Sequence, residues 1–232
     1  MGYNAMGDIY YMKNSDVCIL EKPILVNKPE GLTLTDNDME IRADFSKSIN
    51  RIRKGVLGTE LLVKAAKVKN ASNGLRAVDA TAGFGEDSLL LAAAGFEVDL
   101  YEYDEVIYKL LEDAVKRALE DEILRPVVSR MHLHNESSIE AMKSLEFVPN
   151  VVLLDPMFPE RQKSASVKKK FQLLQKLEHP CDNEAELLEA AMKTKAGKIV
   201  IKRPSKGPYL CDRKPDYSIA GKAIRYDVIF NG

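Results

Sequence analysis

The chain has 232 residues, of which 45% are hydrophobic and 30% are charged, and its formal net charge is -1. This composition is typical of a folded globular protein and excludes a chain that is disordered throughout. No apolar run approaches the roughly 20 residues that cross a bilayer, and the first residues lack the basic start and apolar centre of a signal peptide. We therefore expect a cytoplasmic protein.

Cysteine and histidine give no sign of a metal site. The three cysteines have no CxxC spacing, so we expect reduced thiols rather than a zinc site. His132 and His134 share one face of an expected strand, but no cysteine or carboxylate stands at ligand spacing from them. We expect a protein without a bound metal.

Charge is distributed unevenly along the chain. Residues 97–122 contain ten acidic and three basic side chains, whereas residues 161–225 contain sixteen basic and seven acidic ones. A protein that must approach a polyanion without being basic overall could carry this pattern. Solvated helix faces that differ in charge explain the same numbers, so composition alone leaves both interpretations open.

The beginning of the chain predicts a small lobe. Short apolar or alternating runs between residues 17 and 45 are broken at Pro29-Glu30-Gly31 and at Asp36-Asn37-Asp38. This pattern predicts a mostly β N-terminal lobe over residues 1–50. Residues 51–74 follow as a basic linker, which begins RIRKGVLG, and a helix over about residues 59–67. The remaining residues, 75–232, form the main domain.

Strand and helix patterns alternate in the main domain. We expect strands at residues 75–80, 96–103, 130–136, 151–155 and 197–203, and helices at residues 86–94, 105–119, 137–145 and 183–195. Two further strands close the chain and meet near Gly221. Repeated βα units of this length predict an α/β fold, a doubly wound parallel sheet with helices on both faces. The closing pair adds antiparallel edge strands.

The first strand of this alternating part ends in an acidic loop. The loop contains Asp79, Gly83, Gly85, Glu86 and Asp87. Ligands of such sheets bind at the carboxyl ends of the strands, where glycines let a ligand lie against the backbone beside the amides of the next helix. The carboxylates would repel a pyrophosphate but attract a cofactor with an ammonium and a sulfonium group. The loop therefore favours S-adenosyl-L-methionine.

A dinucleotide-binding loop is the alternative at this point. Its fingerprint has a third glycine where this chain has Ser88. A nicotinamide-dependent dehydrogenase therefore remains as a more distant alternative.

Two further strand ends carry polar groups that suit an adenosine. Glu102 ends the second strand, twenty-three residues after Asp79, where one carboxylate can bind both hydroxyls of a ribose. The third strand is followed by Asn135, Glu136, Ser137 and Ser138, which could contact an adenine edge or cap the next helix. Both interpretations of this last group stay open.

The fourth strand ends in Asp155-Pro156-Met157-Phe158. The exocyclic amine of a nucleobase is a poor nucleophile, so it has to be held facing the methyl group by acceptors for its two hydrogens. Asp155 would be the side-chain acceptor, Pro156 would supply a carbonyl, and Phe158 would stack on a base drawn out of its surroundings. Carbon methylation would need a cysteine nucleophile, but the only Pro-Cys pair, at residues 180–181, lies away from any expected strand end.

Three segments resemble a known family. The strings VDATAGFGEDSLLLAAAGFEVDLYE, VVLLDPMFPERQKSASVKKK and KIVIKRP are similar to those of the ribosomal RNA small subunit methyltransferase J family, over about residues 23–230. The resemblance implies a Rossmann-like class I methyltransferase domain over residues 75–232. It also implies methyl transfer from S-adenosyl-L-methionine to the N2 amine of a guanine in small-subunit ribosomal RNA.

The resemblance also implies site residues. The family's cofactor contacts fall on Glu86, Asp87, Glu102, Tyr103, Ser137, Ser138 and Asp155. Two positions depart from the family pattern, because Glu86 and Tyr103 stand where the family has arginines. The absence of these two arginines leaves the pocket more acidic than the family pattern.

We expect methyl transfer by in-line displacement, with Asp155, Pro156 and Phe158 as the catalytic residues. A set of basic side chains would bind the RNA phosphates, with a solvated helix face as the alternative explanation. The set is Arg51, Arg53, Lys54, Arg161, Lys163, Lys168, Lys169, Lys170, Lys202 and Arg203. The partner would be ribosomal RNA or the assembled small subunit, with no membrane.

Two alternatives remain within this interpretation. The substrate could be another nucleobase amine, such as adenine N6 in DNA or RNA. The protein could also be a non-catalytic RNA-binding assembly factor, which the replaced arginines at Glu86 and Tyr103 keep open.

Overall fold

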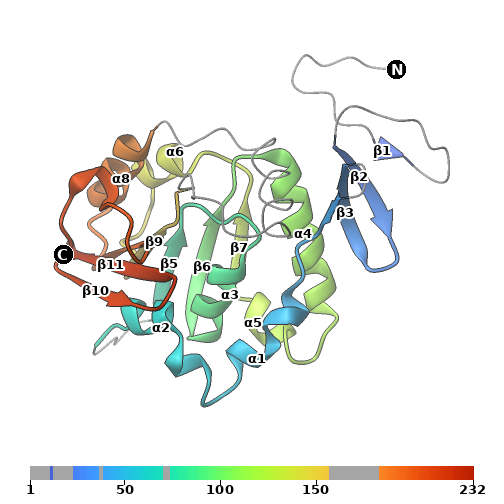
Figure 1. The fold of residues 1–232 in the computed structure, drawn as a ribbon, viewed down its shortest axis with the longest axis horizontal. Helices are drawn as coiled ribbons and strands as arrows, with labels where there is room; N and C mark the ends of the chain where they lie inside the picture. The colour runs from blue at the N-terminus through green and yellow to red at the C-terminus, as the bar shows by residue number, and fades with distance from the viewer. Residues whose placement is uncertain (1–10, 13–22, 37–38, 70–73, 157–182) are drawn as a thin grey trace.

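A computed structural model describes residues 11–12, 23–36, 39–69, 74–156 and 183–232. Their main body is a seven-stranded sheet with helices on both faces, and a four-stranded sheet lies to one side of it (Figure 1). Within these residues, no helix has the length and apolar character to cross a membrane.

The seven-stranded sheet has the order β10-β11-β9-β8-β5-β6-β7. Its strands are β5 (Leu75–Asp79), β6 (Phe96–Tyr101), β7 (Met131–His134), β8 (Val151–Leu154), β9 (Lys198–Pro204), β10 (Tyr217–Ala220) and β11 (Ile224–Phe230). Strands β5 to β9 are parallel, and β11 is antiparallel to both of its neighbours. The predicted doubly wound parallel sheet is confirmed. Because β11 lies between β9 and β10, only one strand of the closing pair is at the edge.

Strand order reverses between β5 and β8. From β5 the chain moves outward through β6 and β7, then returns to place β8 on the other side of β5. In open α/β sheets this switch point is where ligands bind, at the carboxyl ends of the strands. The loops after Asp79 and after Leu154 therefore lie at the expected place for a site.

Helices cover the two faces of the sheet. On one face lie α2 (Leu61–Ala66), α3 (Glu86–Ala93) and α4 (Glu105–Leu119), and on the other lie α6 (Ser138–Lys143) and α8 (Glu184–Lys193). Neighbouring residues of a strand point to opposite faces, so Leu153 packs in the first layer and Val152 in the second. The all-apolar sequence of β8 follows from this, since both of its faces are buried.

The longest helix among the described residues, α4, begins where the sequence predicts. The Asp104 carboxylate accepts hydrogen bonds from the backbone amides of Val106 at 2.8 Å and Ile107 at 2.9 Å, which is the capping arrangement of an N-cap residue. Leu110 and Leu111 lie one turn further on and are buried against the sheet.

Short elements connect the two sheets and the main helices. They are the α-helices α1 (Ile49–Ile52) and α5 (Arg125–Val128) and the 3-10 helices η1 (Phe45–Ser48), η2 (Leu57–Thr59) and η3 (Leu210–Asp212). The sequence patterns did not predict them, because a single turn carries too few residues to show a period.

The smaller sheet has the order β1-β2-β3-β4. Its strands are β1 (Tyr11–Met12), β2 (Ile24–Lys28), β3 (Gly31–Asp36) and β4 (Met39–Ile41). It rests on α4, because the Leu32 amide donates to Asp113 at 3.1 Å and Arg117 donates to the Ala43 carbonyl at 2.6 Å. The β-rich N-terminal part is thus confirmed, whereas the domain boundaries at residues 50 and 74 stay a prediction.

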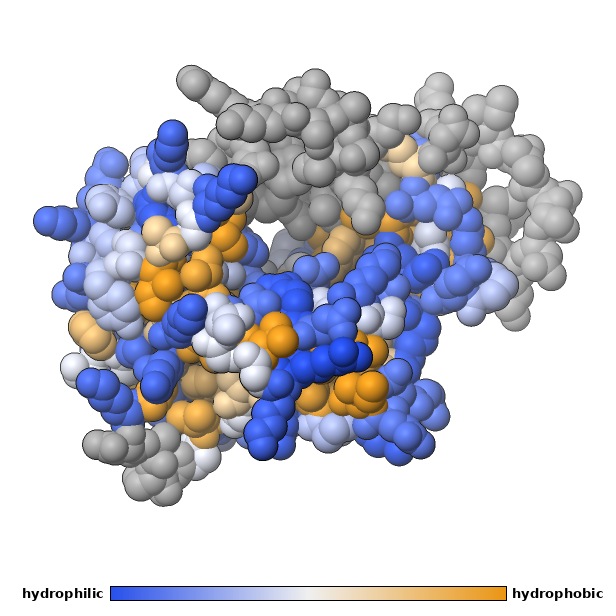
Figure 2. Space-filling model, turned by 60° about the horizontal axis from the view of Figure 1, so that its bottom comes forward, coloured by the Kyte–Doolittle hydropathy of each residue, from blue (hydrophilic) through white to orange (hydrophobic). Residues whose placement is uncertain are grey.

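The described surface on the face drawn in Figure 2 is largely hydrophilic, with separate hydrophobic patches. Scattered apolar side chains are normal on a globular protein. A hydrophobic patch therefore needs a second property, such as a nearby charge cluster, before it indicates a partner.

Candidate cofactor and catalytic site

The loop after β5 is fixed by the carboxylate of Asp79. This side chain is buried, and it accepts a hydrogen bond from the Thr81 amide at 3.1 Å and another from the Ser88 hydroxyl at 2.5 Å. The Thr81 hydroxyl in turn accepts a hydrogen bond from the Asp155 amide at 2.7 Å. Burial raises the pKa of Asp79 to about 7. Thr81, whose amide is bound by the buried carboxylate, thus joins the loop after β5 to the end of β8.

The two loop glycines, Gly83 and Gly85, share a left-handed backbone but differ in the space around them. Both adopt positive φ, +52° at Gly83 and +73° at Gly85, which is costly for other residues. A Cβ at Gly85 would lie 2.7 Å from the Leu111 Cδ1 atom and 3.2 Å from the Phe45 Cζ atom, so a side chain there would have to displace packed neighbours. A Cβ at Gly83 would meet no described atom within 4 Å. Gly83 therefore offers an open backbone surface.

Glu102, after β6, holds the same loop from the other side. Its carboxylate accepts hydrogen bonds from the Gly83 amide at 3.0 Å and the Asp104 amide at 2.8 Å, one at each oxygen. Burial raises the pKa of Glu102 to about 7. Each carboxylate oxygen has a second lone pair, so two ribose hydroxyls could still donate to this group.

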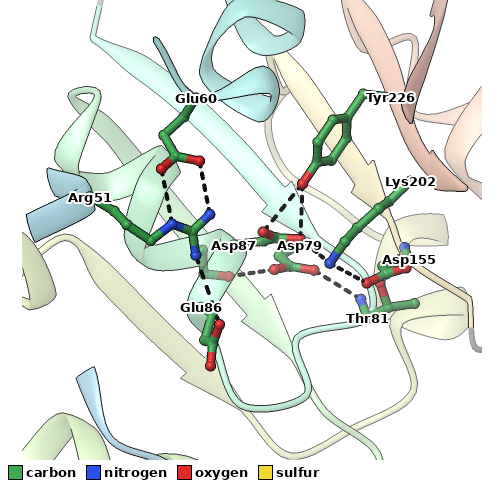
Figure 3. A network of polar contacts seen from close by, with 10 residues as sticks. Arg51, Glu60, Asp79, Thr81, Glu86, Asp87, Asp155, Lys202 and Tyr226 are labelled. Atoms are coloured by element: carbon green, nitrogen blue, oxygen red, sulfur yellow. Dashed lines mark hydrogen bonds and ion pairs between the residues drawn. The ribbon is translucent and has the colours of Figure 1, made fainter. Parts of the chain in front are cut away.

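Lys202, in β9, joins two carboxylates at the centre of the site (Figure 3). Its ammonium donates to Asp87 and to Asp155, each at 2.8 Å, and the Tyr226 hydroxyl lies 3.4 Å from Asp87. Burial alone would lower the pKa of Lys202, but the two carboxylates outweigh it, so the pKa lies above its ordinary value. Burial also raises the pKa of Asp155, and Lys202 opposes that shift.

Arg51, in α1, lies at the start of α3. It donates to both carboxylate oxygens of Glu60, at 3.0 and 2.9 Å, and another nitrogen lies 3.8 Å from Glu86 (Figure 3). A guanidinium from a distant part of the chain therefore stands beside position 86. The side chain of Glu86 is exposed, and Tyr103 is 78% exposed.

Ser137 and Ser138 follow β7, the edge strand that lies two places from β5 in the sheet. Ser137 occupies the N-cap position of α6, but its hydroxyl makes no capping hydrogen bond, and Ser138 is buried. The structure therefore does not support helix capping as the role of the Ser137 side chain. An adenine contact for these serines stays a prediction.

The structure separates the residues expected to bind phosphates. Arg53 and Lys54 are exposed, whereas Arg51 and Lys202 are engaged with carboxylates. Arg203 is 2% exposed, donates to the Pro208 carbonyl at 3.2 Å and lies 3.3 Å from Glu184. Its buried position does not fit a phosphate contact. The other expected residues, Phe158, Arg161, Lys163, Lys168, Lys169 and Lys170, lie outside the described residues.

The histidines of β7 pair with carboxylates of β6. His132 lies 3.0 Å from Glu97, and His134 lies 3.1 Å from Asp99 and stacks on Tyr101. In the part of the chain that the structure describes, no group of three or more metal-binding side chains is present.

The sequence did not reveal the role of Lys202. The signal that could have found it is its place in KIVIKRP, since β8 and β9 are parallel and pair Leu154 with Ile201. Asp155 and Lys202 each follow one of these paired residues, so they lie side by side at the same end of the sheet. Tyr226 and Arg51 come from distant segments and carry no comparable local signal.

The described residues fit a cationic cofactor. Four carboxylates, those of Asp79, Asp87, Glu102 and Asp155, converge on the switch point, and one ammonium, that of Lys202, lies among them. Burial is the main cause of the raised pKa values of Asp79 and Glu102, and neighbouring carboxylates add to it. The open surface at Gly83 leaves room for a ligand beside these groups.

This sheet order, with carboxylates gathered at its switch point, fits the class of S-adenosyl-L-methionine-dependent methyltransferases, and the model of a SAM-dependent methyltransferase family matches residues 16–231. A curated relative from Pseudomonas fluorescens, a ribosomal RNA small subunit methyltransferase J, is 42% identical over 191 residues, which are 81% of this chain and 73% of the relative. One of the same name from Pseudomonas aeruginosa is 39% identical over 196 residues, 83% of this chain and 75% of that one. The chain belongs to the ribosomal RNA small subunit methyltransferase J family.

Solved structures agree with this assignment. A SAM-dependent methyltransferase from Neisseria gonorrhoeae has a TM-score of 0.73 and 29% identity, over 90% of this chain and 83% of that one. An rRNA methyltransferase from Streptomyces viridochromogenes shares the fold alone, with a TM-score of 0.53 and 13% identity over 78% of this chain and 92% of that one. The predicted family, class I methyltransferase fold and S-adenosyl-L-methionine cofactor are confirmed.

Proposed function

We propose that the protein methylates the exocyclic N2 amine of a guanine in small-subunit ribosomal RNA. The observation that carries the proposal is the Asp155 carboxylate, which stands beside the cofactor loop at the end of β8 and is held there by Lys202. The names of the relatives support an RNA substrate from the small ribosomal subunit. Such a substrate would place the reaction in the cytoplasm.

The cofactor would lie across the ends of β5 and β6. We assign its binding to Asp79, Gly83, Gly85, Glu86, Asp87, Glu102, Tyr103, Ser137, Ser138 and Asp155. When bound, S-adenosyl-L-methionine supplies an electrophilic methyl group on a sulfonium. The carboxylates around Gly83 would attract its positive charges, and Glu102 would accept hydrogen bonds from the ribose hydroxyls.

Asp155 would orient the substrate amine. Lys202 donates to the Oδ2 atom of Asp155, and we assign the Oδ1 atom to an amine hydrogen. Pro156 would offer its carbonyl to the second hydrogen, and it has no amide hydrogen of its own to compete. Orientation of this kind supplies much of the acceleration when a weak nucleophile attacks in line. Stacking of the base on Phe158 stays a prediction, since that residue lies outside the described range.

The RNA strand would run past the exposed basic residues near the site. Arg53 and Lys54 are the described members of this group, and residues 161–170 supply the others in our prediction. Such contacts position a substrate without specifying its sequence. The partner is either free ribosomal RNA or the assembled small subunit.

The decisive experiment replaces Asp155 and measures methyl transfer to small-subunit RNA. In Asp155→Asn, which keeps the shape but loses the charge, we expect the turnover rate to fall by about 100-fold. The cofactor affinity, measured by calorimetry, should fall much less. Glu122→Gln, which changes an exposed carboxylate in the same way, is the control. Undiminished transfer with intact cofactor binding would remove Asp155 from the mechanism.

Mass spectrometry of nucleosides identifies the product. Ribosomal RNA from cells with and without the protein should differ in N2-methylguanosine. A difference in N6-methyladenosine instead would assign the enzyme to another nucleobase amine. No binding of S-adenosyl-L-methionine in calorimetry would contradict the assignment of the cofactor and favour a non-catalytic assembly factor.

A further inference from the structure

A pocket lies at the opposite end of the sheet from the site. Its volume is about 470 Å³, and Asn150 and Lys198 line it where β8 and β9 begin. Asp155 and Lys202 lie toward the other ends of these strands. Since a strand rises about 3.3 Å per residue, the pocket and the catalytic residues are roughly 15 Å apart. The pocket is therefore distinct from the cofactor site.

The lining of this pocket is positively charged. It contains Lys67, Lys69 and Lys198, and no Asp or Glu is among its described lining residues. Lys198 donates to the carbonyls of Ala65 at 3.1 Å and Lys67 at 2.6 Å, and to the Tyr217 hydroxyl at 3.2 Å. These neutral acceptors fix the ammonium, and no carboxylate among the described residues forms an ion pair with it. Lys67 and Lys69 are exposed and can turn toward an anion.

Two aromatic rings form the apolar side of the same pocket. Phe230 is 55% exposed, and its ring centroid lies 5.7 Å from that of Tyr217. The Lys198 ammonium lies 5.8 Å from each ring centroid, within the range of a cation–π contact. The Asp216 carboxylate accepts a hydrogen bond from the Phe230 amide at 2.8 Å, which fixes the backbone. An exposed ring on a fixed strand needs little ordering before it stacks on a flat partner.

We propose that this pocket binds an unpaired nucleotide of the RNA substrate, at a distance from the base that is methylated. Aromatic rings beside lysines are the arrangement by which proteins bind single-stranded nucleic acid, with the base stacked on the ring and the phosphate held by the ammonium groups. The base would stack on Phe230, and Lys67 and Lys69 would contact the phosphate. The inference rests on the proposed RNA substrate but involves none of the residues assigned to catalysis.

Such binding has a defined effect on the reaction. The strand would be held at both ends of the sheet, so the substrate would have to reach around the edge or face of the domain. Binding far from the reacting atoms adds affinity without changing the chemical step. We therefore expect the pocket to affect the KM for RNA and not the kcat at saturating RNA.

The test measures the affinity of the full chain for a single-stranded RNA and for small-subunit ribosomal RNA, each against salt concentration. Phe230→Ala should weaken binding about tenfold. Lys69→Glu should weaken it several-fold and reduce the slope of log K against log salt by about 0.7 for each phosphate that the variant no longer binds. Both should raise the KM for RNA and leave the cofactor affinity unchanged. Thermal unfolding checks that the variants fold. If Phe230→Ala does not fold, Lys69→Glu still tests the proposal, because Lys69 is exposed.

Two substitutions elsewhere serve as matched controls. Lys116→Glu makes the same charge change at an exposed position of α4, and Ile123→Ala truncates an apolar side chain that is 53% exposed. If the wild-type protein methylates ribosomal RNA but the pocket variants bind RNA as their controls do, the pocket proposal is overturned and the proposed function stands. The pocket variants could instead methylate assembled subunits more weakly while their affinity for naked RNA is unchanged. This result would also overturn the pocket proposal, because it would indicate that the pocket contacts a ribosomal protein. Failure of the wild-type protein to bind or methylate ribosomal RNA would overturn the proposed function as well.

Discussion

Removal of the Lys202 charge is the sharpest test of how the site is held together. Lys202→Met keeps most of the aliphatic chain but leaves Asp87 and Asp155 without the ammonium that lies 2.8 Å from each. At an effective dielectric constant of about 20, one such contact is worth roughly 6 kcal/mol before desolvation is subtracted. Loss of one partner of a buried ion pair costs about 3–5 kcal/mol. The Asp155 side chain is 38% exposed, so water screens part of this, and we expect about 2–3 kcal/mol of lost stability.

The same substitution changes the pH dependence. Without Lys202, the pKa of Asp155 should rise further, because Lys202 is the largest influence that lowers it. A carboxyl whose pKa is higher in the folded than in the unfolded state destabilises the fold once it ionises. The loss of stability in Lys202→Met should therefore be largest at high pH and shrink as the pH falls through that pKa. Methyl transfer should fall at neutral pH and recover partly as the pH rises.

Urea unfolding and the pH profile of kcat measure these two effects. Lys193→Met is the control, since that lysine pairs with Glu189 at the surface and both side chains are 64% exposed. Lys202→Arg keeps the charge and should keep most of the stability. Cofactor affinity should not fall in Lys202→Met, because a positive charge beside a cationic ligand has been removed. A variant with wild-type stability and an unshifted pH profile would refute this account of the site.

Two further predictions concern the acidic loop. Because Asp79 and Glu102 have pKa values of about 7, the stability of the cofactor-free protein should fall as pH rises from about 4 to 7, where the unfolded state has already lost these protons. Cofactor binding should tighten from pH 5.5 to 7.5 and release protons. Calorimetry in two buffers of different ionisation enthalpy measures the proton release. Binding that is independent of pH and releases no protons would contradict this prediction. Gly85→Ala should cost about 1–3 kcal/mol, because its methyl group meets Leu111. Gly83→Ala should cost about 1 kcal/mol of stability but weaken cofactor binding more, and equal cofactor affinities in the two folded variants would contradict the open surface at Gly83.

The sequence was sufficient for the parts of the site that stand at strand ends. Asp79, Glu102 and Asp155 each follow an apolar run, and the carboxyl ends of parallel strands meet at one edge of the sheet. Local pattern and one topological rule therefore brought these three residues together. The structure confirms the sheet that this inference needs.

The pairings of basic residues could not be predicted in the same way. Lys202 and Arg203 are neighbours in the chain, and both were expected to bind phosphates. Their side chains point to opposite faces of β9, so Lys202 meets Asp87 of α3 and Arg203 meets Glu184 of α8. A count of charges along the sequence cannot distinguish the roles of these two residues, because each pairs with a carboxylate of a different helix.

Arg51 illustrates the same limit. Its partner Glu60 lies at the start of α2, and the packing of α1 on α3 places Glu86 nearby. The sequence alone shows a glutamate at position 86, and only the tertiary structure shows that a guanidinium stands nearby. Whether Arg51 acts on the cofactor can be measured by the cofactor affinity of Arg51→Met.

Because of its place in the sheet, β11 is needed to complete the site in a newly synthesised chain. This strand pairs with the whole of β9, from Lys198 to Pro204, yet it is synthesised after every other strand of the sheet. Until it is added during translation, β9 is an unprotected edge that can pair with other chains. Lys202 then lies on that edge, and Tyr226 has not yet reached Asp87. A chain in which β11 has not yet paired with β9 thus lacks the contact between Tyr226 and Asp87, and we expect full activity only after this pairing.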